Sequence, residues 1–125
     1  MIKRFLALPF LVATSLSTTS PALAQDAAAG EKVFKTQCMV CHSLLPGKIG
    51  IGPSLHDVVD RSAGTLANYQ YSAANKSSGL TWDSATLDRY LLNPKQIVPG
   101  TKMVYAGLKN DTQRADLIAY LATLK

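Results

Sequence analysis

The fold of this chain is decided by the stretch Cys38-Met39-Val40-Cys41-His42. Two cysteines three residues apart, followed directly by a histidine, form the attachment motif of a c-type haem. On one helical turn, Cys38 and Cys41 can each form a thioether with one vinyl group of the same porphyrin, and His42 then faces the iron. The chain has 2 cysteines in total, so all of its thiol chemistry lies here. The motif predicts one covalent haem c with His42 as an iron ligand.

A Cys-x-x-Cys pair has two other common functions. A redox disulfide usually lies in a βαβ unit, and no strand pattern surrounds Cys38 and Cys41. A zinc site would need further ligands, and His56 is the one histidine beyond the motif, at an unusual spacing for such a site. The motif therefore favours haem over both alternatives.

Residues 1–24 have the pattern of an export signal. Lys3 and Arg4 form a basic start, an apolar run follows at 5–12, and Ala22-Leu23-Ala24 is a small-residue cleavage site. The apolar run is shorter than the roughly 20 residues of a membrane span, and an uncleaved anchor is the alternative. We expect a cleaved signal peptide at 1–24 and a mature domain at 25–125.

The composition of the mature part fits one small domain. It has 101 residues, too few for a second domain, and a buried haem would supply much of its apolar core. The precursor has a net charge of +5, which falls to +3 when Lys3 and Arg4 are removed. The remaining charges are scattered, which argues against nucleic-acid binding and favours a weakly steered encounter with an acidic protein surface.

The periodicity of the mature part predicts an all-α domain without a convincing strand. Glycine and proline mark the loops, and Asn93-Pro94 ends one helix before an extended loop at 97–103. The predicted helices cover 26–38 with Asp26 as N-cap, 72–76, 82–92 with Thr81 as N-cap, and a last helix to 124 capped by Asp111 or Thr112.

Gly30 lies in the middle of the first predicted helix. Ala27, Gly30 and Phe34 recur at helical spacing. A glycine inside a helix costs about 1 kcal/mol relative to alanine. A close helix crossing at Gly30, where a side chain would not fit, would account for the glycine. This crossing is a hypothesis for the structure to test.

The second ligand of the iron decides the function, because an open sixth position would allow small molecules to bind. Met39 lies inside the attachment motif and cannot reach the opposite face of the haem. Met103 follows Pro99-Gly100-Thr101-Lys102 on a loop, so a role as core filler on a helix is disfavoured. The competing ligand is His56, which would make the iron bis-histidine and lower its potential. On the residues alone, Met103 is the favoured candidate, with His56 as the alternative.

Several further segments extend the pattern over residues 27–124. The segments are CMVCH at 38–42, GPSLHDVVDRSAGT at 52–65, YSAANKSSGLTW at 71–82, YLLNPKQIVPGTKM at 90–103 and DLIAYL at 116–121. Their order and spacing resemble class I cytochrome c, the family of mitochondrial cytochrome c and bacterial cytochrome c2. The resemblance implies a small fold in which the N- and C-terminal helices cross and shorter helices and loops wrap one haem.

The resemblance also implies a role for residues around the cofactor. Pro53 matches the proline whose carbonyl accepts the ring N–H of the axial histidine, which fixes its orientation. Tyr71 and Trp82 match the donors to a buried haem propionate, and Arg61 matches the nearby cation. Asn75 and Thr101 match polar groups near an internal water and a propionate. Met103 matches the axial methionine, and Tyr90 matches the hydroxyl beside its sulfur. The residues at the family's crossing of the terminal helices are matched by Gly30, Phe34, Leu117 and Tyr120.

The chain departs from the family at its haem-edge lysines. Gln37 stands where a lysine often precedes the first haem cysteine, and Tyr105 stands where many relatives have phenylalanine, a change expected to be mild. The remaining lysine ring is Lys35, Lys48, Lys95, Lys102 and Lys109. We therefore expect less salt-sensitive association with partners than in strongly basic relatives.

The family implies a monomeric, non-enzymatic electron carrier. Export fits it, since haem is attached outside the bacterial inner membrane, which predicts a periplasmic protein without stable membrane insertion. The implied partners are transient redox complexes, such as a cytochrome bc1-type donor and an oxidase or reaction-centre acceptor in a respiratory or related chain. If Met103 stayed off the iron, gas sensing or peroxide chemistry would be the alternative, and a haem-free structural domain is a third.

Overall fold

The structure, a computed structural model, describes residues 25–125. This part contains five helices: α1 (Ala27–Gln37), α2 (Ala73–Lys76), α3 (Ser84–Leu92), α4 (Pro94–Ile97) and α5 (Asp111–Ala122). Within it, β pairing is limited to an isolated antiparallel bridge between Ser62 and Thr81. The predicted all-α class is confirmed. The predicted signal peptide and its cleavage site lie outside the described residues.

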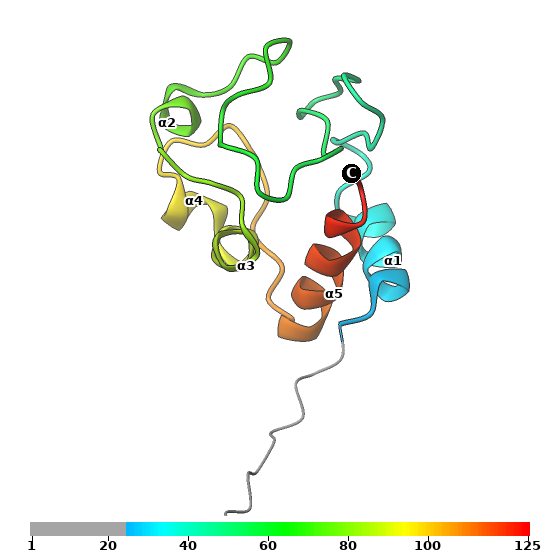
Figure 1. The fold of residues 1–125 in the computed structure, drawn as a ribbon. Coiled ribbons are helices and arrows are strands. Elements are labelled where there is room, and N and C mark those ends of the chain that lie inside the picture. Colours follow the sequence, from blue (N-terminus) through cyan, green and yellow to red (C-terminus); the bar gives the residue numbers. More distant parts are fainter. Residues whose placement is uncertain (1–24) are drawn as a thin grey trace, which may run out of the picture.

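The two terminal helices cross at Gly30. Figure 1 shows α1 and α5 side by side, with α3 and α4 on the other side of the molecule. Gly30 is buried, and a Cβ atom there would lie 1.9 Å from the backbone oxygen of Asp116 and 2.8 Å from the Cβ of Tyr120. One turn further along α1, the rings of Phe34 and Tyr120 pack with centroids 6.1 Å apart. The hypothesis of a close crossing at Gly30 is confirmed.

Side-chain caps set the starts of α1 and α2. The Asp26 carboxylate accepts hydrogen bonds from the amides of Ala28 and Ala29, at 2.9 and 3.1 Å. The Ser72 hydroxyl accepts one from the Asn75 amide at 3.0 Å. In addition, the Asp26 amide donates to the Asp116 carboxylate at 2.8 Å, which ties the start of α1 to α5. Both helices lie where the sequence predicted them.

The third helix begins later than predicted. Thr81 is paired with Ser62, and the Trp82 amide donates to the Arg61 carbonyl at 2.9 Å, so the chain is still extended there. The N-cap is therefore Asp83, whose carboxylate accepts from the Thr86 amide at 2.8 Å, and the predicted Thr81 cap is wrong. The cause is a tertiary backbone pairing that local sequence does not reveal.

Two further boundaries differ from the predictions. The chain after Asn93 forms the short helix α4 before the predicted loop, with the Asn93 side chain as its N-cap and Pro94 at its first position. The last helix is capped by Asn110, whose side chain accepts from the Gln113 amide at 2.9 Å. The Asp111 carboxylate instead pairs with Arg114 at 2.8 Å, so neither Asp111 nor Thr112 is the cap.

The core joins the predicted apolar faces of α1, α3 and α5 to nearby loops. Its members are Val33, Phe34, Val58, Val59, Trp82, Leu87, Tyr90, Leu91, Val98, Leu108, Leu117, Ile118 and Leu121. Arg114 lies buried beside them at 4% exposure and donates to the Asp88 carboxylate of α3 and the Leu108 carbonyl. Among residues 25–125, no helix has the length and apolar character needed to cross a membrane.

Candidate haem-binding site

The attachment motif continues the chain of α1 as a hydrogen-bonded turn. The Cys41 and His42 amides donate to the Cys38 carbonyl at 3.1 and 2.9 Å. Cys38 and Cys41 are partly buried, whereas Met39 and Val40 between them are 57% and 81% exposed. The turn therefore faces both thiols toward the protein and the two intervening side chains toward solvent. Met39 accordingly lies on the surface.

The two thiols are poorly suited to redox exchange or zinc binding. Burial, with a smaller contribution from Cys41, raises the pKa of the Cys38 thiol to about 11. Thiol exchange needs the thiolate, which is scarce at neutral pH with such a pKa. Within residues 25–125, no three His, Cys, Asp or Glu side chains are grouped to hold a metal ion. The two cysteines therefore fit thioether attachment of a haem better than a redox disulfide or a zinc site.

His42 is held with one ring nitrogen free. Its Nδ1 lies 2.8 Å from the Pro53 carbonyl oxygen, which can only accept, so Nδ1 carries the proton and Nε2 keeps its lone pair. Burial lowers the pKa of His42, partly opposed by the bond to Pro53, so the ring stays neutral. A Cβ atom on Gly52 would lie 2.4 Å from the His42 Cε1. The ring thus packs directly on the Gly52 backbone, with Nε2 available to a metal.

Arg61 fixes the segment that carries Pro53. Its guanidinium donates to the carbonyls of Ser54 and His56, both at 3.1 Å, and burial lowers its pKa. Ser54 is 2% exposed, and its hydroxyl donates to the Leu45 carbonyl at 2.7 Å. Ser54 therefore helps to hold the loop behind His42. The sequence reasoning missed Ser54, because a serine in a Gly/Pro loop carries no signal of burial.

A second group of candidate residues gathers around Met103. The Tyr90 hydroxyl donates to the Met103 sulfur at 3.9 Å and lies 3.3 Å from the Thr101 hydroxyl. The Thr101 hydroxyl also accepts from the Met103 amide at 3.3 Å. The rings of Trp82 and Tyr90 pack with centroids 4.7 Å apart, and burial raises the pKa of Tyr90. The Met103 side chain packs against the core while its thioether faces a protonated hydroxyl.

Tyr71 and Asn75 lie at the edge of this region. The Tyr71 hydroxyl accepts from the Leu66 amide at 3.3 Å, and its ring meets the Tyr69 ring edge-on at 4.8 Å. Within the described residues, the Asn75 side-chain oxygen is buried without a hydrogen-bond partner. Such a buried acceptor needs a donor, which an enclosed water supplies.

His56 lies apart from these groups. Its amide donates to the Ser54 hydroxyl at 3.1 Å and its carbonyl accepts from Arg61, so its backbone belongs to the loop behind His42. In residues 25–125, its ring makes no hydrogen bond with the protein. These contacts give no support to His56 as the second ligand.

The residues present fit a haem. Two partly buried thiols, a neutral imidazole with Nε2 free and a thioether turned to the core are the groups that hold such a cofactor. An open hollow of about 390 Å³ lies on the outer side of the attachment turn and is lined in part by Met39, Val40, Cys41 and His42.

Comparison with known proteins gives a consistent result. The family model for cytochrome c matches residues 27–125. The chain is 57% identical over 101 residues to cytochrome c2 of Rhodomicrobium vannielii, covering 80% of each chain. It is 49% identical over 113 residues to cytochrome c2 of Blastochloris viridis, covering 90% of this chain and 86% of the relative. The solved structure of cytochrome cH from Methylobacterium extorquens matches with a TM-score of 0.74 and 49% identity, covering 78% of this chain and 98% of that one.

Proposed function

The chain belongs to the cytochrome c family, and we propose that it is a single-electron carrier whose haem iron is held between His42 and Met103. The family binds one haem c covalently through cysteines and carries electrons, and Cys38 and Cys41 occupy the attachment positions. The haem supplies a one-electron ferric–ferrous couple. The observation that carries the proposal is the Met103 sulfur, which packs toward the core 3.9 Å from the Tyr90 hydroxyl.

The protein's own residues would do three things for such a couple. The Pro53 carbonyl orients the His42 ring, and burial keeps that ring neutral. A thioether ligand and a buried site both favour the ferrous state, which raises the potential. Thr101 bonds both the Tyr90 hydroxyl and the Met103 amide, which fixes the position of Met103. A fixed Met103 would keep the ligand set nearly the same in the two oxidation states. With both axial positions filled, no substrate binds at the metal, and the protein is proposed not to be an enzyme.

The proposed propionate contacts come from Arg61, Tyr71, Trp82, Asn75 and Thr101. Arg61 is the cation of this set, and Asn75 brings a buried oxygen without a protein partner. Asn75 carries an amide nitrogen beside that oxygen, so it can hold an enclosed water or a polar edge of the cofactor. These assignments rest on the family resemblance together with the contacts described above.

The holoprotein's spectrum and redox titration test the proposal. A low-spin ferric spectrum with a methionine–iron charge-transfer band, and no rapid carbon monoxide binding by the reduced protein, are expected. High-spin iron with fast ligand binding would instead support a sensor or a peroxidase-like enzyme. Mass spectrometry that found no covalent haem would exclude all of these functions together.

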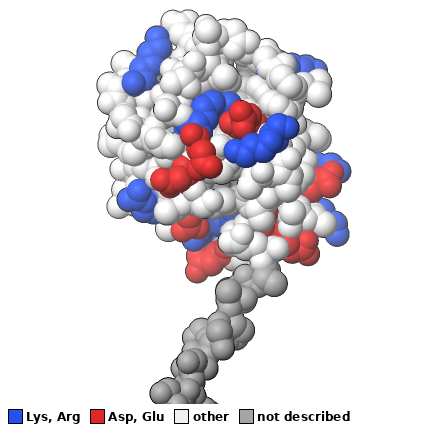
Figure 2. All heavy atoms as spheres, in the orientation of Figure 1, with Lys and Arg blue, Asp and Glu red and all other residues white. Residues whose placement is uncertain are grey.

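We propose a periplasmic protein, exported by the signal peptide at 1–24, that acts as a monomer between membrane redox complexes. A bc1-type donor and an oxidase or reaction-centre acceptor are the partner classes considered. Figure 2 shows acidic and basic side chains interspersed on one face, without a large patch of either sign. Of the haem-edge lysines, Lys35 forms an ion pair with Glu31 at 2.7 Å, which offsets its charge. Lys102 donates to the Gln70 carbonyl and Lys109 to the Leu92 carbonyl at 2.6 Å, and both keep their charge.

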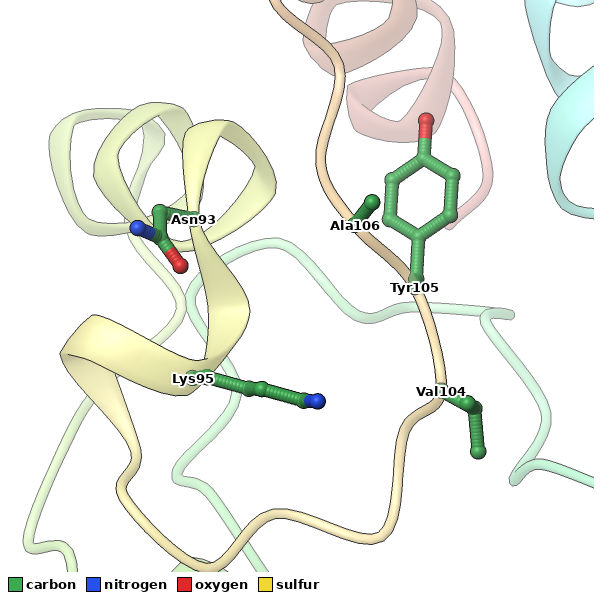
Figure 3. A pocket seen from close by; sticks show the side chains of 5 residues that line it. All are labelled: Asn93, Lys95, Val104, Tyr105 and Ala106. Atoms are coloured by element: carbon green, nitrogen blue, oxygen red, sulfur yellow. The ribbon is translucent and has the colours of Figure 1, made fainter.

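Within residues 25–125, Lys95 forms no ion pair, and it lies beside an apolar contact surface. It extends from α4 across a shallow cavity of about 250 Å³ toward Val104, which is 96% exposed (Figure 3). A partner carboxylate could meet the Lys95 ammonium while an apolar partner side chain covers Val104. Such a contact suits a small, short-lived redox interface.

This arrangement predicts a weak dependence of electron transfer on salt. Between low and physiological ionic strength, the second-order rate with a membrane complex is expected to fall by roughly threefold or less, because a thinned lysine ring among interspersed acidic side chains steers the encounter weakly. The matched control is Gln96→Lys on exposed α4, which adds a free charge next to Lys95 and should steepen the decline. A steep decline in the unmodified protein would contradict the prediction.

A further inference from the structure

The segment that carries Met103 is held by few hydrogen bonds. We define the methionine strap as residues 102–107. In the described part of the chain, the strap takes part in no backbone–backbone hydrogen bond, whereas the next residue, Leu108, donates to the Leu91 carbonyl at 2.8 Å. At that end the chain is also fixed by Gly107, where a Cβ atom would lie 2.1 Å from the Leu92 oxygen. The strap is therefore anchored at 107–108 and depends on side chains elsewhere.

One side-chain bond connects the strap to the helix that leads into the attachment motif. The Tyr105 hydroxyl donates to the Gln37 side-chain oxygen at 3.1 Å, across a separation of 68 residues in the sequence. Gln37 is the last residue of α1 and directly precedes Cys38. In Figure 3 the Tyr105 ring points away from Lys95, toward the side on which α1 and α5 lie. The bond thus joins the segment of one proposed haem anchor to the segment of the proposed second ligand.

The two partners are both departures from the family pattern. Gln37 replaces a frequent lysine, and Tyr105 replaces a frequent phenylalanine. Taken separately, Tyr105 was expected to be a mild change and Gln37 a loss from the lysine ring. Together they make a neutral donor–acceptor pair that neither usual residue can form, since phenylalanine has no hydroxyl and lysine has no acceptor.

We propose that the Tyr105–Gln37 hydrogen bond is a latch that keeps the methionine strap closed and positions Met103 toward the iron. The proposal rests on the proposed ligation by Met103. Tyr105 and Gln37 are positioning residues that act through the strap, since the hydrogen bond to the Met103 sulfur within residues 25–125 comes from Tyr90. Opening the latch releases the strap at Tyr105, while its anchor at 107–108, the bond of Lys102 to the Gln70 carbonyl and the Thr101 contact of Met103 stay in place.

A double-mutant cycle on the holoprotein tests the latch. The variants are Tyr105→Phe, Gln37→Met and the double substitution, which remove the donor, the acceptor and both with little change in volume. The first measurement is the unfolding equilibrium constant in guanidinium chloride. Each single variant should raise it by about two- to tenfold, the range of one hydrogen bond, and the double variant should raise it no further. Additive effects would show that no latch exists.

The second measurement is the rate at which imidazole displaces Met103 from the ferric iron. Each single variant is expected to raise that rate by about two- to tenfold, again without a further increase in the double variant. Gln37→Glu keeps an acceptor for the Tyr105 hydroxyl, so its rate of imidazole binding should equal that of the unmodified protein. If the cycle shows coupling but the imidazole rate does not change, the bond is structural only and the positioning role is wrong.

The matched control is Tyr69→Phe. The Tyr69 hydroxyl donates to the Ile51 carbonyl at 3.2 Å, so this variant also loses one exposed tyrosine hydrogen bond. The Tyr69 ring, whose centroid lies 5.2 Å from the Lys102 ammonium of the strap, stays in place as phenylalanine. It should leave the imidazole rate unchanged, and an equal acceleration would contradict a specific latch. If the unmodified protein lacks a methionine–iron band, the proposed ligation fails and the positioning role fails with it, while the unfolding cycle still reports whether the bond exists.

Discussion

Substituting Met103 by leucine is expected to convert a six-coordinate, low-spin haem protein into one with an open iron position. Leucine keeps nearly the same volume but has no sulfur, so the change isolates the ligand from the packing. The methionine–iron band should disappear, the reduced protein should bind carbon monoxide rapidly, and the potential should fall by on the order of 0.2 V, within the range that axial ligands span.

Two matched variants make this result specific. Met39 lies 57% exposed in the attachment turn, so Met39→Leu should leave the spectrum and potential unchanged. His56→Gln should also have no effect, since its backbone belongs to the loop behind His42 and its ring is not placed as a ligand. If Met103→Leu leaves spectrum and potential unchanged, the ligand assignment is wrong, and loss of the low-spin spectrum in His56→Gln would identify the other ligand.

The second large effect is expected from Gly30→Leu. The nearest backbone atom of α5 would lie 1.9 Å from the new Cβ, and backbone cannot give way as the end of a flexible side chain can. The terminal helices must separate, so we expect a loss of about 3 kcal/mol or more, beyond the usual overpacking penalty. For a domain of this size, that loss lowers the midpoint of thermal unfolding by roughly 15 °C.

Thermal unfolding followed by circular dichroism, together with the yield of folded protein, measures this effect. Covalent haem should still be detected by mass spectrometry, because the attachment motif is local and does not require the crossing. Ala28→Leu places the same side chain on the exposed face of α1 and should change the stability by about 0.5 kcal/mol or less. A Gly30→Leu protein as stable as the Ala28→Leu protein would show that α1 and α5 do not approach this closely.

Local sequence predicted those parts of the structure that depend on neighbouring residues. The Asp26 cap of α1 and the Ser72 start of α2 were readable because a cap acts over two or three residues. The third helix was misplaced at its start, because the pairing of Trp82 with Arg61 comes from a distant loop. The Asn110 cap was missed because the Asp111 carboxylate, an equally good capping group, is taken by Arg114.

The candidate site also has residues that the sequence predicted and contacts that only the structure shows. The motif and the family resemblance gave its residues, and the structure places Pro53 against His42 and groups Tyr90 and Thr101 with Met103. The buried Ser54 that holds the loop behind His42 has no sequence signal. Nor does the pairing of Tyr105 with Gln37, since each residue alone reads as a neutral surface change.

By itself, the sequence determined the covalent cofactor and the helical class, because a haem attachment motif and helical periodicity act within a few residues. It also raised the hypothesis of a close helix crossing at Gly30. Only the tertiary structure decided which backbone approaches Gly30, which hydroxyl faces the Met103 sulfur and which side chain closes the strap over α1. Those contacts join residues far apart in the chain, and their partners are chosen by packing around a shared core, which no local pattern encodes.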